Sequence, residues 1–199
     1  MTLLVIDNRD SFTFNLVDAF AVAGAQVSVV RNSIAAEAAI ERAGDGAILL
    51  SPGPGAPTDA GSCLAICAAA RRRVPLIGIC LGHQAIVEAA GGTVVRAPEP
   101  HHAKVTRLDH PGDGIFAGLP SPLAIGRYHS LATPTDSVPH NFTVDSTHEN
   151  FAMAVRDDHG LQLGLQFHPE SILTPRGDIL IANLLTWADA ASARHRRAA

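Results

Sequence analysis

The chain has 199 residues, of which 47 % are hydrophobic and 17 % are charged, and its formal net charge at pH 7 is −4. That length and composition fit one globular domain, and the negative charge gives no electrostatic basis for binding nucleic acid or an anionic membrane. Because the sequence has no apolar run near the roughly 20 residues of a membrane span, no recognisable secretory signal and only three cysteines, we expect a cytoplasmic protein without membrane partners.

The first half of the chain alternates short apolar runs with helical patterns. We predict strands at Leu3–Ile6, Gln26–Val30, Ala47–Leu50 and Leu76–Ile79. We predict helices at Ser11–Ala23, Ala35–Arg42, Thr58–Arg73 and Gln84–Ala90. This alternation requires crossover connections, so it predicts an α/β fold with an open, mostly parallel sheet and helices on both faces.

The second half is richer in short strands, separated by Pro, Gly and Asp turns. They are predicted at Lys104–Asp109, Leu123–Arg127, Phe142–Asp145, Phe151–Arg156 and Leu161–Phe167. A last helix is predicted at Asp178–Ala190. We therefore expect a single domain over residues 1–190 with β-rich additions, followed by a basic, disordered tail at 191–199.

A cysteine marks the end of the fourth predicted strand. Cys80 lies between Gly78 and Gly82 in the pattern G-x-C-x-G, the thiol counterpart of the strand-to-helix turn that raises a nucleophile above a sheet. The glycines suit this turn because side chains there would collide with the neighbouring elements. The N-terminus of the following helix favours the thiolate, and the amide of Leu81 can donate to a developing oxyanion. A buried structural cysteine is the alternative, and it leaves the two glycines without a role.

A cysteine nucleophile needs a base that a third group orients. His168 is predicted at the carboxyl end of the last strand, where α/β sheets bind ligands. Glu170 lies two residues on, so both side chains can leave an extended segment on the same side. A carboxylate so placed can fix the tautomer of the imidazole, although a capped surface histidine is also compatible with these residues.

The stretch "ILLSPGPGAP" follows the third predicted strand. Pro52 and Pro54 stiffen the loop, while Gly53 and Gly55 keep free amides with no side chain to hold a ligand away. Beside Cys80, this loop could supply a second oxyanion donor.

Together these segments resemble the class I, triad-type glutamine amidotransferases. The likeness rests on "GICLGHQ", "SPGPGAP", "RYHSL" and "QFHPESILT", and it runs from "LLVIDNRDSFTFN" to "NLLTWA". The resemblance implies a flavodoxin-like sheet, L-glutamine as substrate, and Cys80, His168 and Glu170 as the catalytic residues. It further implies that substrate is bound by a set of loop and helix residues: Gly53, Pro54, Gly55, Leu81, Gln84, Ser130 and Leu131.

Within that family, the sequence is most similar to glutaminase subunits that pass ammonia to a chorismate-using synthase. The implied partner is anthranilate synthase component I, which we favour, or aminodeoxychorismate synthase component I, and one subunit could serve both. No cofactor is implied for this chain, and magnesium is expected in the partner. One departure is the "HHAK" segment, where Ala103 replaces a glycine usual in the family and puts any special backbone conformation there in doubt.

Two further classes of function remain open from the residues alone. A free-standing cysteine hydrolase would use the same turn without a partner. A flavodoxin-like binding module would use Asp7, at the end of the first predicted strand, and would not need the thiol.

Overall fold

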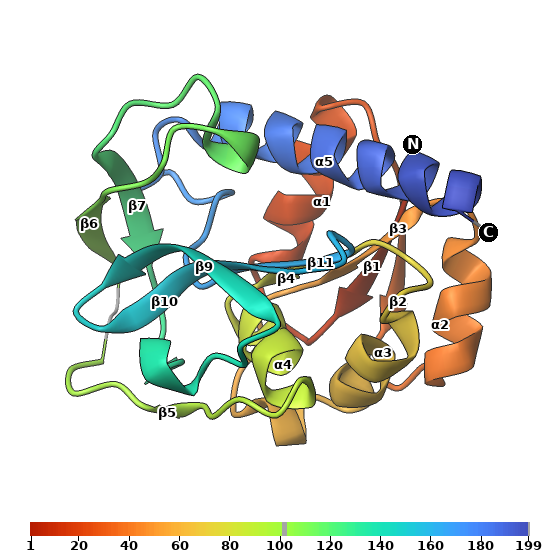
Figure 1. Ribbon diagram of the computed structural model, residues 1–199, viewed down its shortest axis with the longest axis horizontal. Helices are drawn as coiled ribbons and strands as arrows, with labels where there is room; N and C mark the ends of the chain where they lie inside the picture. Colours follow the sequence, from red (N-terminus) through yellow and green to blue (C-terminus); the bar gives the residue numbers. More distant parts are fainter. Residues whose placement is uncertain (101–102, 199) are drawn as a thin grey trace.

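The computed structural model describes residues 1–100 and 103–198, and its centre is a seven-stranded sheet with the order β2-β1-β3-β4-β11-β10-β9 (Figure 1). The parallel strands are β2 (Gln26–Arg31), β1 (Thr2–Asp7), β3 (Ala47–Leu50), β4 (Leu76–Ile79) and β11 (Gln162–Leu165). The antiparallel strands are β10 (Phe151–Asp157) and β9 (Phe142–His148). The predicted mostly parallel sheet is confirmed.

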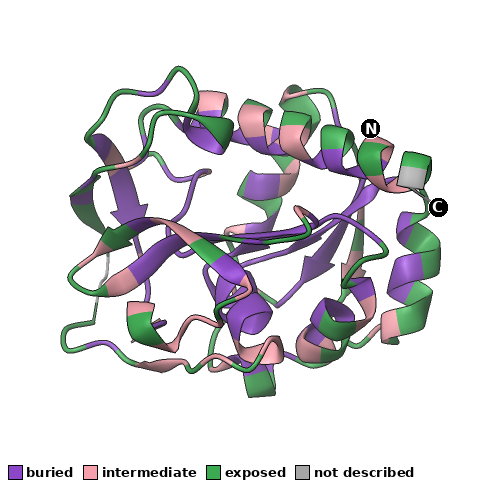
Figure 2. Cartoon of the chain, viewed as in Figure 1, coloured by how far each residue is buried: buried purple, intermediate pink, exposed green. Residues whose placement is uncertain are grey.

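Helices cover both faces of the sheet. On one face lie α1 (Thr13–Val22) and α5 (Gly177–Ala198); on the other lie α2 (Ala36–Ala43), α3 (Cys63–Ala70) and α4 (Leu81–Ala89) (Figure 1). Each face has its own apolar core, and the central strands β1, β3, β4 and β11 between them are buried, whereas the edge strands β2 and β9 are partly exposed (Figure 2). This explains why β3 and β4 read "AILL" and "LIGI" without polar alternation, since both sides of these strands are covered.

The second half adds two small antiparallel ribbons to the sheet. They pair β6 (Lys104–Leu108) with β7 (Leu123–Arg127) and β5 (Val95–Arg96) with β8 (Leu131–Ala132). Short 3-10 helices lie at Pro57–Asp59, Gly114–Phe116 and Thr135–Ser137. The β6–β7 ribbon matters for function because an antiparallel bridge joins Gly126 to His168. None of the described helices is both long and apolar enough to span a membrane.

The predicted helix over Thr58–Arg73 is broken in the structure. Gly61 has a φ of +59°, and a Cβ there would collide with the backbone carbonyl of Asn32. The same carbonyl accepts a hydrogen bond from the amide of Ser62 at 2.8 Å. The contact with the end of β2 therefore stops the first turn, and α3 begins anew at Cys63.

The expectation of a disordered tail at 191–199 is wrong for residues 191–198, which continue helix α5. Ala191 and Ser192 are buried, and the Ser192 hydroxyl donates to the carbonyl of Gly46 at 3.1 Å. Packing of one side of this segment against the domain stabilises the helix, and the basic composition of the segment gives no sign of that packing. Residue 199 lies outside the described part of the chain.

Candidate active site

Cys80 stands at a strained turn between β4 and α4. Its φ is +54° and its ψ is −101°, a conformation that costs a non-glycine residue of the order of 1–3 kcal/mol. A Cβ on Gly78 would collide with the backbone of Gly82, and one on Gly82 would collide with the carbonyl of Leu50. The two glycines therefore permit α4 to pack closely against β4 and β3, which is the role that the G-x-C-x-G pattern predicts.

The thiol opens onto a cavity of about 330 Å³ at the carboxyl end of the sheet. Cys80 itself is 7 % exposed. Of the described residues, those that line this cavity are Asp10, Phe12, Pro52, Gly53, Cys80, Ala103, Tyr128 and His168. The cavity thus joins segments from the ends of β1, β3, β4, β7 and β11, as expected for a ligand site in an open α/β sheet.

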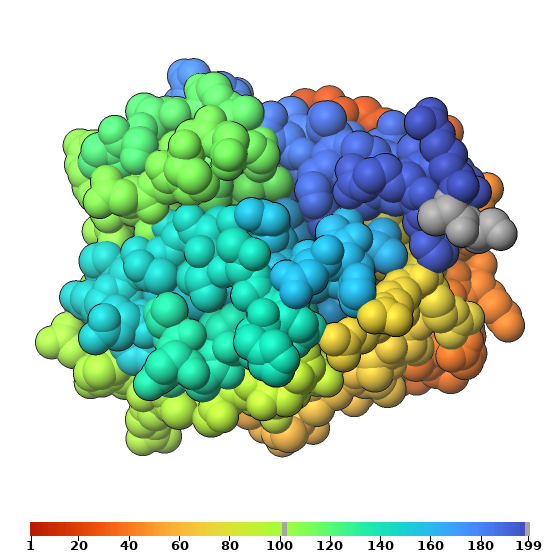
Figure 3. Space-filling view, in the orientation of Figure 1, coloured from red at the N-terminus to blue at the C-terminus, as the bar shows by residue number. Residues whose placement is uncertain are grey.

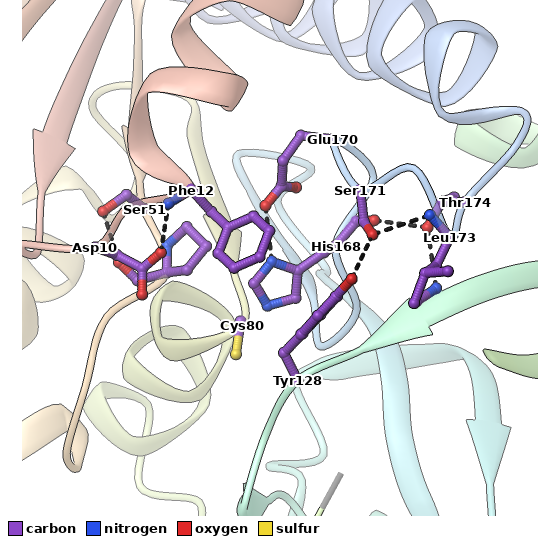
Figure 4. A network of polar contacts seen from close by, with 12 residues as sticks. Asp10, Phe12, Ser51, Cys80, Tyr128, His168, Glu170, Ser171, Leu173 and Thr174 are labelled. Carbon is purple, nitrogen blue, oxygen red and sulfur yellow. Dashed lines mark hydrogen bonds and ion pairs between the residues drawn. The ribbon is translucent and has the colours of Figure 1, made fainter. Parts of the chain in front are cut away.

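His168 and Glu170 form a buried pair beside the thiol. The Nδ1 atom of His168 lies 2.7 Å from Oε1 of Glu170, and the side chains are 3 % and 0 % exposed (Figure 4). The other ring nitrogen, Nε2, has no hydrogen-bond partner among the described residues and lies on the side of the ring that faces Cys80 (Figure 4). The carboxylate therefore fixes the ring with Nε2 toward the cavity.

The charge state of His168 follows from the same contacts. Burial lowers the pKa of the imidazole, but interactions with Cys80 and Glu170 favour its charged form and together raise the pKa to about 10. The imidazole therefore carries a proton near neutral pH. A protonated imidazole next to a sulfur can stabilise a thiolate and can protonate a leaving group.

Two aromatic rings and a small polar network hold the imidazole in place. The rings of Phe12 and Tyr128 meet it edge-on, with centroids 5.2 and 5.0 Å from its own. The Tyr128 hydroxyl lies 2.9 Å from the hydroxyl of Ser171, and the Thr174 hydroxyl donates to the carbonyl of His168 at 2.7 Å (Figure 4). These contacts restrict the ring to one orientation.

The loop "SPGPGAP" divides between two cavities. Gly53 lines the thiol cavity, and a Cβ on it would lie 2.5 Å from Cδ2 of Leu81. Pro54 and Gly55 instead line a neighbouring cavity of about 470 Å³, together with Leu81. Leu81 is the first residue of α4, so its amide has no partner within the helix and remains available near the thiol.

The remaining predicted binding residues, Gln84, Ser130 and Leu131, are not among the residues that line the thiol cavity. The side-chain amide of Gln84 donates to the carbonyl of Leu131 at 2.9 Å and to Oε1 of Gln166 at 3.0 Å. Ser130 is exposed, and its carbonyl accepts the amide of Ala97. The structure thus brings Gln84 and Leu131 together through a direct bond.

Gln166 is a site residue that the sequence reasoning missed. Its side-chain nitrogen lies 3.7 Å from the sulfur of Cys80, and its oxygen accepts from Gln84. A usable signal was present, because Gln166 and His168 alternate on one side of the chain leaving β11, and a buried glutamine there needs a partner. Phe12 and Tyr128 lie within the quoted segments "LLVIDNRDSFTFN" and "RYHSL", but they were not singled out, since isolated aromatic residues usually belong to a core.

Ala103 adopts the left-handed backbone conformation despite its side chain, with a φ of +56°. It is exposed at the mouth of the thiol cavity. The alanine in "HHAK" therefore adopts a conformation that glycine takes without strain, and its Cβ makes that conformation unfavourable. His101 and His102 lie outside the described residues.

The other two cysteines differ from Cys80. Cys63 and Cys67 are buried in α3, and burial raises the pKa of Cys63 to about 11 and that of Cys67 well above its usual value. Their thiols therefore stay protonated and poorly reactive at neutral pH. Within the described residues, no group of three or more His, Cys, Asp or Glu side chains is arranged to hold a metal ion.

Comparison with known proteins identifies the family. A family profile described as "Glutamine amidotransferase class-I" matches residues 4–187. The chain belongs to this family. The resemblance inferred from its motifs is thereby confirmed, and the matched residues include Cys80, His168 and Glu170.

Relatives of this amidotransferase carry two different names. The chain is 48 % identical to anthranilate synthase component 2 of Vibrio parahaemolyticus, covering 94 % of this chain and 95 % of that one. It is 44 % identical to aminodeoxychorismate synthase component 2 of Escherichia coli, covering 92 % and 98 %. A crystal structure of a Thermoplasma acidophilum protein shares the fold, with a TM-score of 0.80 at 24 % identity over 100 % of this chain and 96 % of that one.

Proposed function

We propose that this chain is the glutaminase subunit of a chorismate-using synthase and that Cys80, His168 and Glu170 are its catalytic residues. The observation that carries the proposal is the buried pair of His168 and Glu170, with Nε2 of the imidazole directed to the side of Cys80. A structural cysteine would not need a strained turn, and a capped surface histidine would not be 3 % exposed.

The first half of the proposed reaction forms a thioester. The Cys80 thiolate attacks the carboxamide carbon of L-glutamine, and the carbonyl oxygen becomes an oxyanion held by the amides of Gly53 and Leu81. When the tetrahedral intermediate collapses, the C–N bond breaks and the protonated His168 gives its proton to the departing nitrogen, which leaves as ammonia.

The second half returns the enzyme to its starting state. Neutral His168 now accepts a proton from a water molecule, which attacks the γ-glutamyl thioester. The C–S bond breaks, glutamate leaves, and the thiolate and the imidazolium are restored. Gln84 and the backbone of Ser130 and Leu131 would hold the α-amino and α-carboxyl groups of glutamine. Because these residues do not line the thiol cavity, substrate must enlarge the cavity toward Gln166, which contacts both Gln84 and Cys80.

The partner is proposed to be anthranilate synthase component I, with aminodeoxychorismate synthase component I as the second candidate. The 48 % identity to an anthranilate synthase component 2 favours the first, and the 44 % identity to an aminodeoxychorismate synthase component 2 supports the second. The proposal places the protein in the cytoplasm, needs no cofactor in this subunit and assigns magnesium to the partner synthase.

The test measures glutamate release from L-glutamine by the native chain and by Cys80→Ala, each with either synthase and chorismate. We expect the native chain to release glutamate with one of the two synthases and Cys80→Ala to release it at least 10³-fold more slowly. Free ammonium should restore formation of the synthase product with either the native chain or the variant. Equal glutamate release by the two proteins would refute the role of Cys80. Full turnover without any synthase would instead support a free-standing hydrolase.

A further inference from the structure

Three segments far apart in sequence meet at the end of the sheet opposite Cys80. They are the loop at 71–73 between α3 and β4, the turn at 158–160 between β10 and β11, and the last turns of α5. In Figure 3 they adjoin as yellow, light-blue and dark-blue surfaces on one face. A backbone hydrogen bond from Leu76 to Leu161 ties the loop and the turn together at the amino ends of β4 and β11.

This meeting point concentrates positive charge on a chain whose net charge is −4. The segments contain six of the chain's 15 lysines and arginines, together with two histidines and a single carboxylate, Asp158. The basic residues are Arg71, Arg72, Arg73, His159, Arg194, His195, Arg196 and Arg197. The sequence alone separates these residues into two unremarkable basic runs, and only the helical continuation of α5 brings them together.

Between the segments lies a cavity of about 300 Å³. Its lining consists of Arg72, His159, Leu161, Ala191, Arg194 and His195. Leu161 and Ala191 are buried and form an apolar floor, while the arginines are exposed. The cavity therefore combines cationic walls with a small apolar surface, and none of the residues lining it is acidic.

The two guanidinium groups of the cavity have no carboxylate partner within ion-pair distance among the described residues. Nε of Arg72 donates to Nε2 of His159 at 2.9 Å, and Nη2 of Arg194 donates to the carbonyl of Gly160 at 3.4 Å. Arg73 shows the contrast, because its guanidinium is held by Glu37 at 2.9 Å. Most donors of Arg72 and Arg194 thus remain available to a ligand.

Arg72 lies in a tight turn that follows α3, in which the amide of Arg73 donates to the carbonyl of Ala70 at 2.9 Å. Its φ of +62° places a long side chain in the left-handed region, which is unfavourable for residues other than glycine. A simpler explanation of the positive charge is that cations near the C-termini of α3 and α5 interact favourably with the partial negative charge there. That account explains basic residues after each helix, but it does not explain the hydrogen bond from Arg72 to His159 across the cavity.

We propose that this cavity is a binding site for a small molecule that carries a phosphate or pyrophosphate group. Paired guanidinium groups match the oxygens of phosphate through parallel hydrogen bonds, and His195 adds a further donor. The volume suits a compact phosphorylated molecule rather than a strand of nucleic acid, and the apolar floor offers a contact for its organic part. The site is separate from the glutaminase site, and its existence does not depend on the proposed function.

The experiment titrates pyrophosphate into the full-length protein at constant ionic strength and follows binding by calorimetry. The test variant is Arg72→Ala/Arg194→Ala. The control is Arg42→Ala/Arg107→Ala, which removes the same charge from exposed positions elsewhere. We expect binding by the native chain and the control, and at least tenfold weaker binding by the test variant. Amide NMR shifts should be confined to the three segments.

A second variant separates loss of the site from loss of the fold. Arg72→Gly removes the guanidinium and places at this position a residue that tolerates a positive φ. The variant should bind pyrophosphate more weakly, and its melting temperature should be no lower than that of the native chain. Equal affinity in all variants, or shifts near Cys80 instead, would overturn the proposal. Binding of heparin without binding of pyrophosphate would also overturn it, because the face would then be a surface for polyanions.

Discussion

Replacing Glu170 by Gln should lower the pH at which the glutaminase loses activity on the alkaline side. The pKa of His168 is about 10, against an ordinary value of 6.5. Burial lowers this pKa, whereas the contacts with Cys80 and Glu170 raise it by more. One pKa unit corresponds to about 1.4 kcal/mol. Glu170 is one of the two groups that raise this pKa, and an opposite charge in contact shifts a pKa by about one unit or more, so loss of the charge should cost the imidazolium roughly 1–2 kcal/mol.

The sign follows from the proton that the reaction requires. The proposed mechanism uses protonated His168 to expel ammonia, so activity falls as pH rises through the pKa of this group in its pair with Cys80. Glu170→Gln keeps an oxygen that can accept from Nδ1 but removes the charge. The variant should therefore lose activity at a pH about one unit lower and should show kcat/KM reduced by roughly 10²-fold near neutral pH.

The assay measures glutamate release between pH 6 and pH 10.5 with the partner synthase held constant. A matched control is Glu149→Gln, which makes the same change beside His148, 3.6 Å away on the surface. The control should leave the profile unchanged. If the alkaline limb of Glu170→Gln coincides with that of the native enzyme, the carboxylate does not stabilise the imidazolium and the argument from the buried pair is refuted.

Three further predictions concern reactivity and stability. Iodoacetamide should modify Cys80 much faster than the two buried cysteines of α3, as peptide mass spectrometry would show; equal labelling would contradict the assignment. Burial lowers the pKa of His83 from 6.5 to about 4, so between these pH values His83 is protonated in the unfolded chain but not in the folded one. The free energy of unfolding should therefore fall by up to ~3 kcal/mol as pH drops from about 6.5 to 4. Urea unfolding should show this slope flattened in His83→Gln but retained in His140→Gln, and identical slopes would exclude His83 as its source. Ala103→Gly should stabilise the fold by about 1 kcal/mol by relieving the left-handed strain, whereas Ala117→Gly, at a φ of −58°, should not; thermal melting compares the two, and a lower melting temperature for Ala103→Gly would count against strain at this position.

The sequence predicted the parts of the fold whose cause is local. β3 and β4 were placed to the residue because four consecutive apolar residues between turn signals define a strand covered on both faces. The G-x-C-x-G turn was equally visible as a five-residue pattern, although Gly82 is required by contact with Leu50 on a neighbouring strand. Other features that depend on a distant partner were missed. Gly61 breaks a helix only because Asn32 lies against it, and the tail is helical only because Ser192 packs onto Gly46.

The same division explains why the candidate site was only partly predictable. Cys80 and His168 are 88 positions apart, and what joins them is the parallel pairing of β4 with β11, in which Ile79 is opposite Leu165. Given that register, the residues that follow each strand must meet: Cys80 comes directly after Ile79, while Gln166 comes directly after Leu165, with His168 two residues beyond. The rule that ligands bind at carboxyl ends selected the correct edge of the sheet, but no local pattern states which strands are neighbours. A shift of that register by one residue would turn Gln166 and His168 to the opposite side and separate the imidazole from the sulfur. The proposed chemistry therefore depends as much on the pairing of two four-residue strands as on the identity of the reactive side chains.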